Sequence, residues 1–243
     1  MTVTVPSGAP TPATASGTRR RAGSLRLAAT AGLALGLFFA GASQAVEPLS
    51  PPAALDRLAE ADASPAARQL TAWVLETADN QGLPFVIVDK VGARVFAFDR
   101  EGRMLGAAPV LLGLAQGDVS PPGIGDRPLS AIEPEERITP AGRFMASMGE
   151  NLGGKGILWI DYDAALSLHP VVTTRAADRR LQRLATATAE DNRISYGCIN
   201  VPADFYDSVV QPAFHGTTGV VYILPEKQSL AEVFFTAAVN AQP

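Results

Sequence analysis

The spacing of apolar residues over 46–83 differs from that in the rest of the chain. Apolar positions there recur at near-helical intervals, which predicts an N-terminal helical segment. Its second half begins with Ser64 and Pro65, a pair typical of an N-cap and a first helical residue. The apolar residues that repeat are Leu55, Leu58, Leu70, Trp73, Val74 and Ala78.

From Pro84 onward the period changes to that of strands. β-branched runs and alternating apolar and polar positions are separated by short turns, which predicts a mainly β domain over 84–226 with a few helices. Residues 227–243 are expected to form a tail or a helix. The predicted strands are residues 85–89, 94–99, 104–112, 143–148, 156–162, 165–169 and 219–224, and the predicted helices are residues 174–190 and 202–210.

A long segment without periodicity, residues 113–142, interrupts the strands. It carries five prolines and five glycines. Loops of this length inside a compact domain are usually functional or disordered, so we expect it to cover a site, with a plain surface excursion as the alternative.

The first 45 residues have the order of a secretory signal peptide. Basic residues 19–21 precede an apolar run over 27–40, and small residues lead up to a cleavage site after Ala45. The alternative is an uncleaved N-terminal anchor, and export by the Sec or the twin-arginine route stays open. We therefore expect a periplasmic protein with no membrane span after signal cleavage.

Removal of residues 1–45 changes the charge balance. It deletes four arginines and no acidic residue, so the formal net charge moves from −4 to −8. No basic stripe remains, and we expect no nucleic-acid partner.

Cys198 is the only cysteine of the chain, so it has no internal disulfide partner. In an exported protein such a thiol is either a reactive group or a small buried hydrophobe. A nucleophilic cysteine needs a base, and the chain has two histidines, His169 at a predicted strand end and His215 in a turn. His169 is the better placed, and His215 is expected to be a solvated turn residue. The backbone N–H groups of Gly197 and Cys198 are candidate donors to an oxyanion.

Two segments carry a resemblance to a known family. Residues 195–200, Ser-Tyr-Gly-Cys-Ile-Asn, and residues 139–144, Thr-Pro-Ala-Gly-Arg-Phe, resemble the cysteine motif and the Thr-Pro-x-Gly-x-Phe segment of the L,D-transpeptidase (YkuD-like) family. The resemblance extends over about Phe85 to Pro225. Two features depart from the pattern: Tyr196 stands where the family usually has a second histidine, and 25 residues separate His169 from Ser195, more than the usual gap.

The resemblance implies a YkuD-like β-sandwich that acts on the stem peptides of bacterial peptidoglycan. It implies Cys198 as the nucleophile that forms a thioester on a stem tetrapeptide, and His169 as the base. It also implies that the carbonyl of Pro170 orients the imidazole. Further residues of the motif are expected at the substrate, namely Ser195, Tyr196 and Asn200.

Two alternatives remain open beside an L,D-transpeptidase. Water could resolve the thioester, which would make the protein an L,D-carboxypeptidase or related hydrolase, or the domain could be catalytically silent and bind cell-wall peptide. We expect no metal and no other cofactor, because one cysteine and two separated histidines make no recognisable zinc cluster. The sequence does not indicate a protein partner.

Overall fold

The computed structural model describes residues 51–235. The predicted signal peptide, residues 1–45, lies outside the described residues, so the predictions of export and periplasmic location are untested. The division of residues 46–243 into a helical segment, a catalytic domain and a tail also stays a prediction. Within residues 51–235, no helix is long and apolar enough to cross a membrane.

The N-terminal helices form where the periodicity predicts them. They are α1 (Pro51–Glu60) and α2 (Pro65–Thr77). The Ser64 side chain accepts a hydrogen bond from the Ala67 N–H at 3.1 Å, which satisfies one of the free donors at the start of α2. The helix ends at Ala78, which takes the left-handed conformation (φ 52°, ψ 35°).

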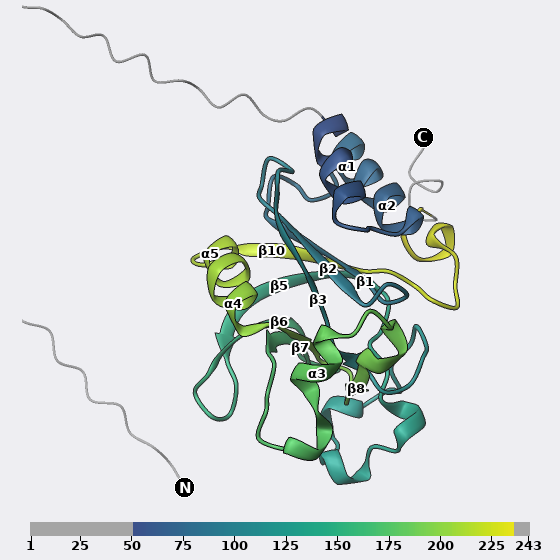
Figure 1. The fold of residues 1–243 in the computed structure, drawn as a ribbon, viewed down its shortest axis with the longest axis vertical. Coiled ribbons are helices and arrows are strands. Elements are labelled where there is room, and N and C mark those ends of the chain that lie inside the picture. Colours follow the sequence, from purple (N-terminus) through teal and green to yellow (C-terminus); the bar gives the residue numbers. More distant parts are fainter. Residues whose placement is uncertain (1–50, 236–243) are drawn as a thin grey trace, which may run out of the picture. The chain divides into compact units, whose positions relative to one another are not determined.

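Eight strands make one mixed sheet, which confirms the mainly β fold class (Figure 1). Their order is β3-β2-β1-β10-β5-β6-β7-β9, and β4 and β8 form a separate parallel pair. The bounds are β1 Phe85–Asp89, β2 Arg94–Phe98, β3 Met104–Pro109, β4 Leu112–Gly113, β5 Gly142–Glu150, β6 Gly156–Asp161, β7 Leu166–Pro170, β8 Arg193–Ser195, β9 Ile199–Val201 and β10 Thr218–Ile223.

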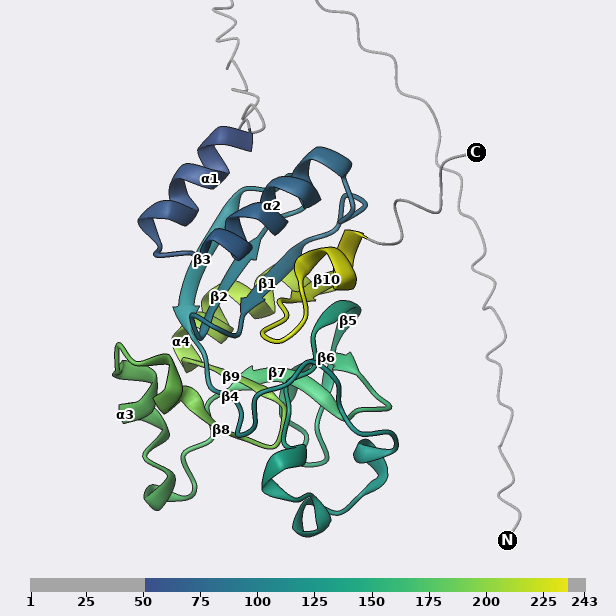
Figure 2. The ribbon, with the colours of Figure 1, turned by 90° about the vertical axis from the view of Figure 1, so that its right-hand side faces the viewer.

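Both faces of the sheet are packed against other elements. On one face, Phe85, Phe98 and Tyr222 share a core cluster with residues of α1 and α2. Figure 2 shows these two helices beside the strands β1, β2 and β3. On the other, residues from both ends of the sheet, such as Val95 of β2 and Leu168 of β7, share one core cluster, so the sheet curls around that core in the manner of a sandwich. This second core also contains residues of the helical stretch 203–214, made of α4 (Ala203–Phe205), a π-helical turn (Tyr206–Val210) and α5 (Gln211–Phe214).

Two predicted elements differ from the structure, and two short strands were missed. The strand predicted over 104–112 is interrupted, because the chain leaves β3 at Pro109 and then pairs as β4 with β8. The helix predicted over 174–190 is wrong in extent. Only α3 (Arg180–Ala185) is α-helical, since Arg179 before it has φ 50° and Thr186 after it is extended. The short strands β8 and β9 beside Cys198 were not predicted, since three residues carry too little periodicity.

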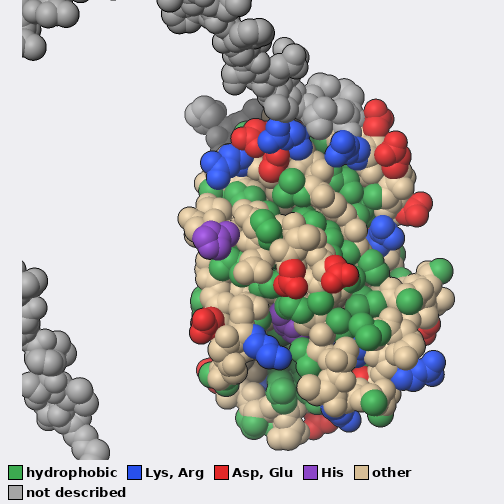
Figure 3. All heavy atoms as spheres, turned by 60° about the vertical axis from the view of Figure 1, so that its left-hand side comes forward, with side chains coloured by type: hydrophobic (Ala, Val, Ile, Leu, Met, Phe, Trp, Pro, Cys, Tyr) green, Lys and Arg blue, Asp and Glu red, His purple; other side chains and the backbone are tan. Residues whose placement is uncertain are grey.

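The other described segments are loops that contain short helical turns. The loop over 113–142 contains 3₁₀ turns at Ile124–Asp126, Leu129–Ala131 and Pro134–Glu136, and two more flank α3 at Ala176–Asp178 and Ala189–Asn192. The last described element is a π-helical turn at Ala231–Phe235. On the face seen in Figure 3, side chains of both charges lie interspersed among apolar ones.

Candidate active site

Parallel pairing of β7 with β9 brings His169 and Cys198 together, although 29 positions separate them in the chain. In this pairing His169 lies opposite Asn200 and Leu168 lies opposite Ile199. Cys198, the residue just before β9, therefore lies beside Ser167. Its Sγ is 3.5 Å from Ser167 Oγ and 3.4 Å from the carbonyl oxygen of Ala165. The thiol is half-buried, so it is neither sealed in the core nor fully in solvent.

The imidazole of His169 is oriented by the next residue, as the resemblance implied. Its Nδ1 lies 2.8 Å from the carbonyl oxygen of Pro170. A carbonyl oxygen can only accept, so Nδ1 carries the hydrogen of this bond. The other ring nitrogen, Nε2, is then the one that can exchange a proton with the sulfur of Cys198.

The two side chains shift each other's pKa in the direction that an ion pair requires. Burial alone would raise the pKa of the Cys198 thiol, but hydrogen bonds from His169 and Ser167 and the charge of His169 hold it below its usual value. Burial alone would lower the pKa of His169, but the hydrogen bond and charge of Cys198 and the bond to Pro170 raise it. Both shifts make the charged forms of the two side chains easier to reach than they would be for the separate groups.

Ser195 braces the turn before the cysteine. Its hydroxyl donates to the Cys198 carbonyl at 2.6 Å and accepts from the Gly197 N–H at 3.1 Å. Ser195 is only 3% exposed, so the structure does not place it as the substrate-binding residue we expected. Because the Gly197 N–H already donates to Ser195, the Cys198 N–H is the one that remains of the two expected oxyanion donors.

Gly197 is required by its backbone conformation. It has φ 130°, and a Cβ at this position would lie 2.8 Å from the carbonyl oxygen of Ile138. The close approach at Gly197 thus comes from the loop over 113–142 of this chain.

Thr139 fastens the same turn from the other side. Its hydroxyl donates to the Gly197 carbonyl at 2.7 Å and accepts from the Gly113 N–H at 2.8 Å, and the residue is fully buried. The segment 113–142 therefore borders the site. The Thr-Pro-Ala-Gly-Arg-Phe motif pointed to this segment, but no pattern in the sequence indicated that Thr139 contacts the cysteine turn.

A buried ion cluster anchors the backbone of Thr139. The Nζ of Lys90 donates to the Thr139 carbonyl at 2.9 Å and to Asp118 at 2.7 Å, and it lies 3.6 Å from Glu226. Burial opposes the charge of Lys90 and lowers its pKa, against the bonds to the two acids. The sequence showed no pattern from which this cluster could have been predicted, because its members are far apart in the chain.

Asn200 and Tyr196 occupy different environments. Asn200 is 1% exposed; its amide donates to the Cys198 carbonyl at 3.3 Å and its oxygen accepts from Arg180 at 2.8 Å. It is thus an internal residue, and we had expected it at the substrate. Tyr196 is half-buried, with the guanidinium carbon of Arg137 4.1 Å from its ring centre. His215 is exposed and takes no part in the site.

A cavity of about 200 Å³ opens beside His169, between the β5–β6 turn and the segment after β7. Lys155 is the only lysine or arginine in its lining. Within residues 51–235, no group of three or more His, Cys, Asp or Glu side chains could hold a metal ion. The cavity is lined by Asn151, Lys155, Gly156, Ile157, His169, Pro170, Val171, Val172, Thr173 and Thr174.

Fold and site together define a mainly β domain with a cysteine–histidine pair at neighbouring strands. No family model and no curated protein matches the sequence. Among solved structures, the NMR structure of the catalytic domain from E. faecium L,D-transpeptidase is similar, with 15% identity over 58% of this chain and 95% of that chain and a TM-score of 0.32. A superposition this loose carries no weight for function, which therefore has to be inferred from the site itself.

Proposed function

We propose that the protein is a cysteine acyltransferase of the bacterial cell wall, an L,D-transpeptidase that acts on stem tetrapeptides of peptidoglycan in the periplasm. The observation that carries the proposal is the Cys198–His169 pair, with the imidazole held by the Pro170 carbonyl. The resemblance of residues 195–200 and 139–144 supplies the substrate class.

The proposed reaction has two acyl transfers. The Cys198 thiolate attacks the carbonyl carbon between the L-centre and the terminal D-alanine. The C–N bond breaks, and the His169 imidazolium gives its Nε2 proton to the leaving amine. An amine of a neighbouring stem then loses a proton to Nε2 and attacks the thioester; the C–S bond breaks and the thiolate forms again.

Intact-mass measurements test this proposal. The purified chain is incubated with a carbapenem, whose strained amide acylates nucleophilic thiols, and separately with muropeptide tetrapeptides. We expect a covalent carbapenem adduct with wild type and with His215→Gln, a matched control at the exposed histidine. Cys198→Ala should form none and His169→Gln should react far more slowly.

The products separate the alternatives. Release of D-alanine together with a cross-linked product supports transpeptidation. Release without cross-linking indicates a carboxypeptidase instead, and a folded protein without adduct or turnover would refute catalysis altogether. Tyr196→His reports whether the tyrosine limits the rate, since a histidine could carry positive charge near the thiolate.

A further inference from the structure

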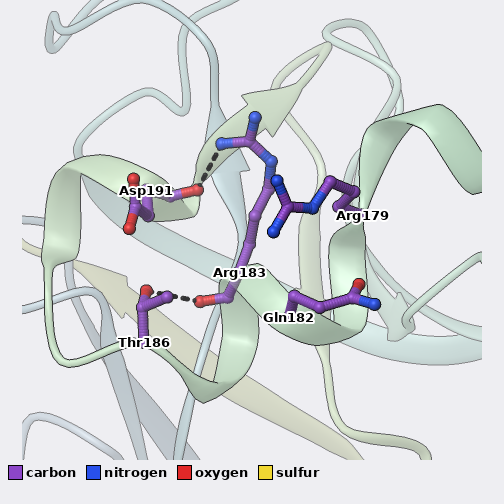
Figure 4. A pocket seen from close by; sticks show the side chains of 5 residues that line it. All are labelled: Arg179, Gln182, Arg183, Thr186 and Asp191. Carbon is purple, nitrogen blue, oxygen red and sulfur yellow. Dashed lines mark hydrogen bonds between the residues drawn. The ribbon is translucent and has the colours of Figure 1, made fainter.

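The segment between β7 and β8 carries several arginines with different contacts. Arg183 closes the segment on itself: its Nη1 donates to the Asp191 carbonyl at 2.7 Å (Figure 4). Its Nε donates to the Asp178 carbonyl at 2.9 Å. Arg179 is exposed and, with Arg183 and Asp191, lines a cavity of about 130 Å³ within this segment. The side-chain hydrogen bonds of Arg183 thus join parts of the segment to each other.

Arg180 is the one that reaches the catalytic residues. Its Nη1 donates to Asn200 Oδ1 at 2.8 Å, while its Nε donates to Asp178 Oδ2 at 3.1 Å. Asn200 in turn donates to the Cys198 carbonyl at 3.3 Å. A continuous path of hydrogen bonds therefore runs from the first residue of α3 to the nucleophile, and Arg180, with a side chain only 16% exposed, is fixed in it from both sides.

We infer that Arg180 is a positioning residue of the active site: through Asn200 it fixes the carbonyl of Cys198. The inserted segment, which lengthens the gap between His169 and Ser195, thus serves to deliver this guanidinium. The inference rests on Cys198 being the nucleophile of the proposed function, but it does not depend on which acceptor resolves the thioester.

The geometry predicts two separable effects. The planar fork of an arginine can bond Asp178 and Asn200 at once, which a lysine ammonium on a flexible stem cannot reproduce. The charge of Arg180 has a second effect, on the pKa of His169. Burial and the charge of Arg180 lower that pKa, whereas the hydrogen bond and charge of Cys198 and the bond to Pro170 raise it. The other cation at the imidazole is Lys155, across the cavity beside His169.

Three variants divide these effects. Arg180→Met removes fork and charge, Arg180→Lys keeps the charge alone, and Arg179→Met removes the same charge one position away. For each, the rate of carbapenem acylation is measured by intact mass, and the ring signals of the two histidines are followed by NMR as a function of pH. The exposed His215 serves as an internal reference signal.

We expect Arg180→Met to acylate roughly tenfold to a hundredfold more slowly, the range typical of a displaced reacting group. Its His169 titration should move to higher pH. Arg180→Lys should lose rate while His169 titrates as in wild type, and Arg179→Met should match wild type in both measurements. The inference is overturned if Arg180→Met behaves like Arg179→Met in rate and titration.

Two checks keep the outcome decisive. Thermal melting of each variant shows whether it is folded. If Arg180→Met is unfolded, the acylation rate of Arg180→Lys, which keeps the aliphatic part of the side chain, tests the inference instead. Should wild type itself fail to react with the carbapenem, the proposed function fails. In that event the NMR signals of the Cys198 carbonyl and of the Asn200 side-chain amide still report the hydrogen-bond path, and unchanged signals in folded Arg180→Met would overturn the inference.

Discussion

Replacement of Thr139 by valine should test how the cysteine turn is held. Thr139 and Val have nearly the same shape, but the hydroxyl of Thr139 satisfies both the Gly197 carbonyl and the Gly113 N–H. The residue is fully buried, so water cannot replace these bonds without rearrangement. Each buried polar group left without a partner costs about 1–3 kcal/mol, so the two groups together give a loss of about 2–6 kcal/mol for Thr139→Val.

Thr139→Ser is the matched control. It keeps the hydroxyl and loses one methyl group, a change of about 1 kcal/mol. Urea unfolding measures both free energies, and carbapenem acylation measures the effect on the nucleophile. A turn released at Gly197 should slow acylation by about tenfold or more in Thr139→Val, while Thr139→Ser stays near wild type. Equal stability and equal acylation of the two variants would show that the hydroxyl does not hold the turn.

Three further predictions concern backbone conformation and charge. Gly197→Ala should strain the turn by about 1–3 kcal/mol and lower the acylation rate, because its Cβ would meet the Ile138 carbonyl; unchanged acylation would contradict this. Burial opposes the charge of Asp118, but the ion pair with Lys90 and three backbone N–H donors lower its pKa from 3.8 to about 2. Its stabilising effect is thus present above pH 3.8 and lost as pH falls toward 2. In Asp118→Asn the free energy of unfolding, measured with urea, should therefore fall less than in wild type between pH 3.8 and 2. Ala78→Gly, at an exposed left-handed helix end, should raise the melting temperature by the equivalent of about 1 kcal/mol, and a lower one would refute the reasoning.

The insertion shows how far local patterns can be interpreted. The apolar spacing over 174–190 predicted a helix, but left-handed Arg179 and extended Thr186 confine α3 to six residues. Nothing in the spacing indicated that one arginine of this segment would bond Asn200. Local periodicity describes which face of a segment is apolar, whereas backbone reversals and distant polar partners depend on the rest of the fold.

The amino-acid sequence determined the broad alternation of strands and helices and the single thiol, and it predicted His169 rather than His215 as the candidate base. Only the tertiary structure decided that β7 and β9 lie side by side in parallel and so unite His169 with Cys198. It also decided that Ser195 and Asn200 turn inward and donate hydrogen bonds to the carbonyl of Cys198. The physical reason is that strand character follows from neighbouring residues, while strand pairing and hydrogen-bond partners join residues far apart in the chain and are selected by the packing of the whole sheet.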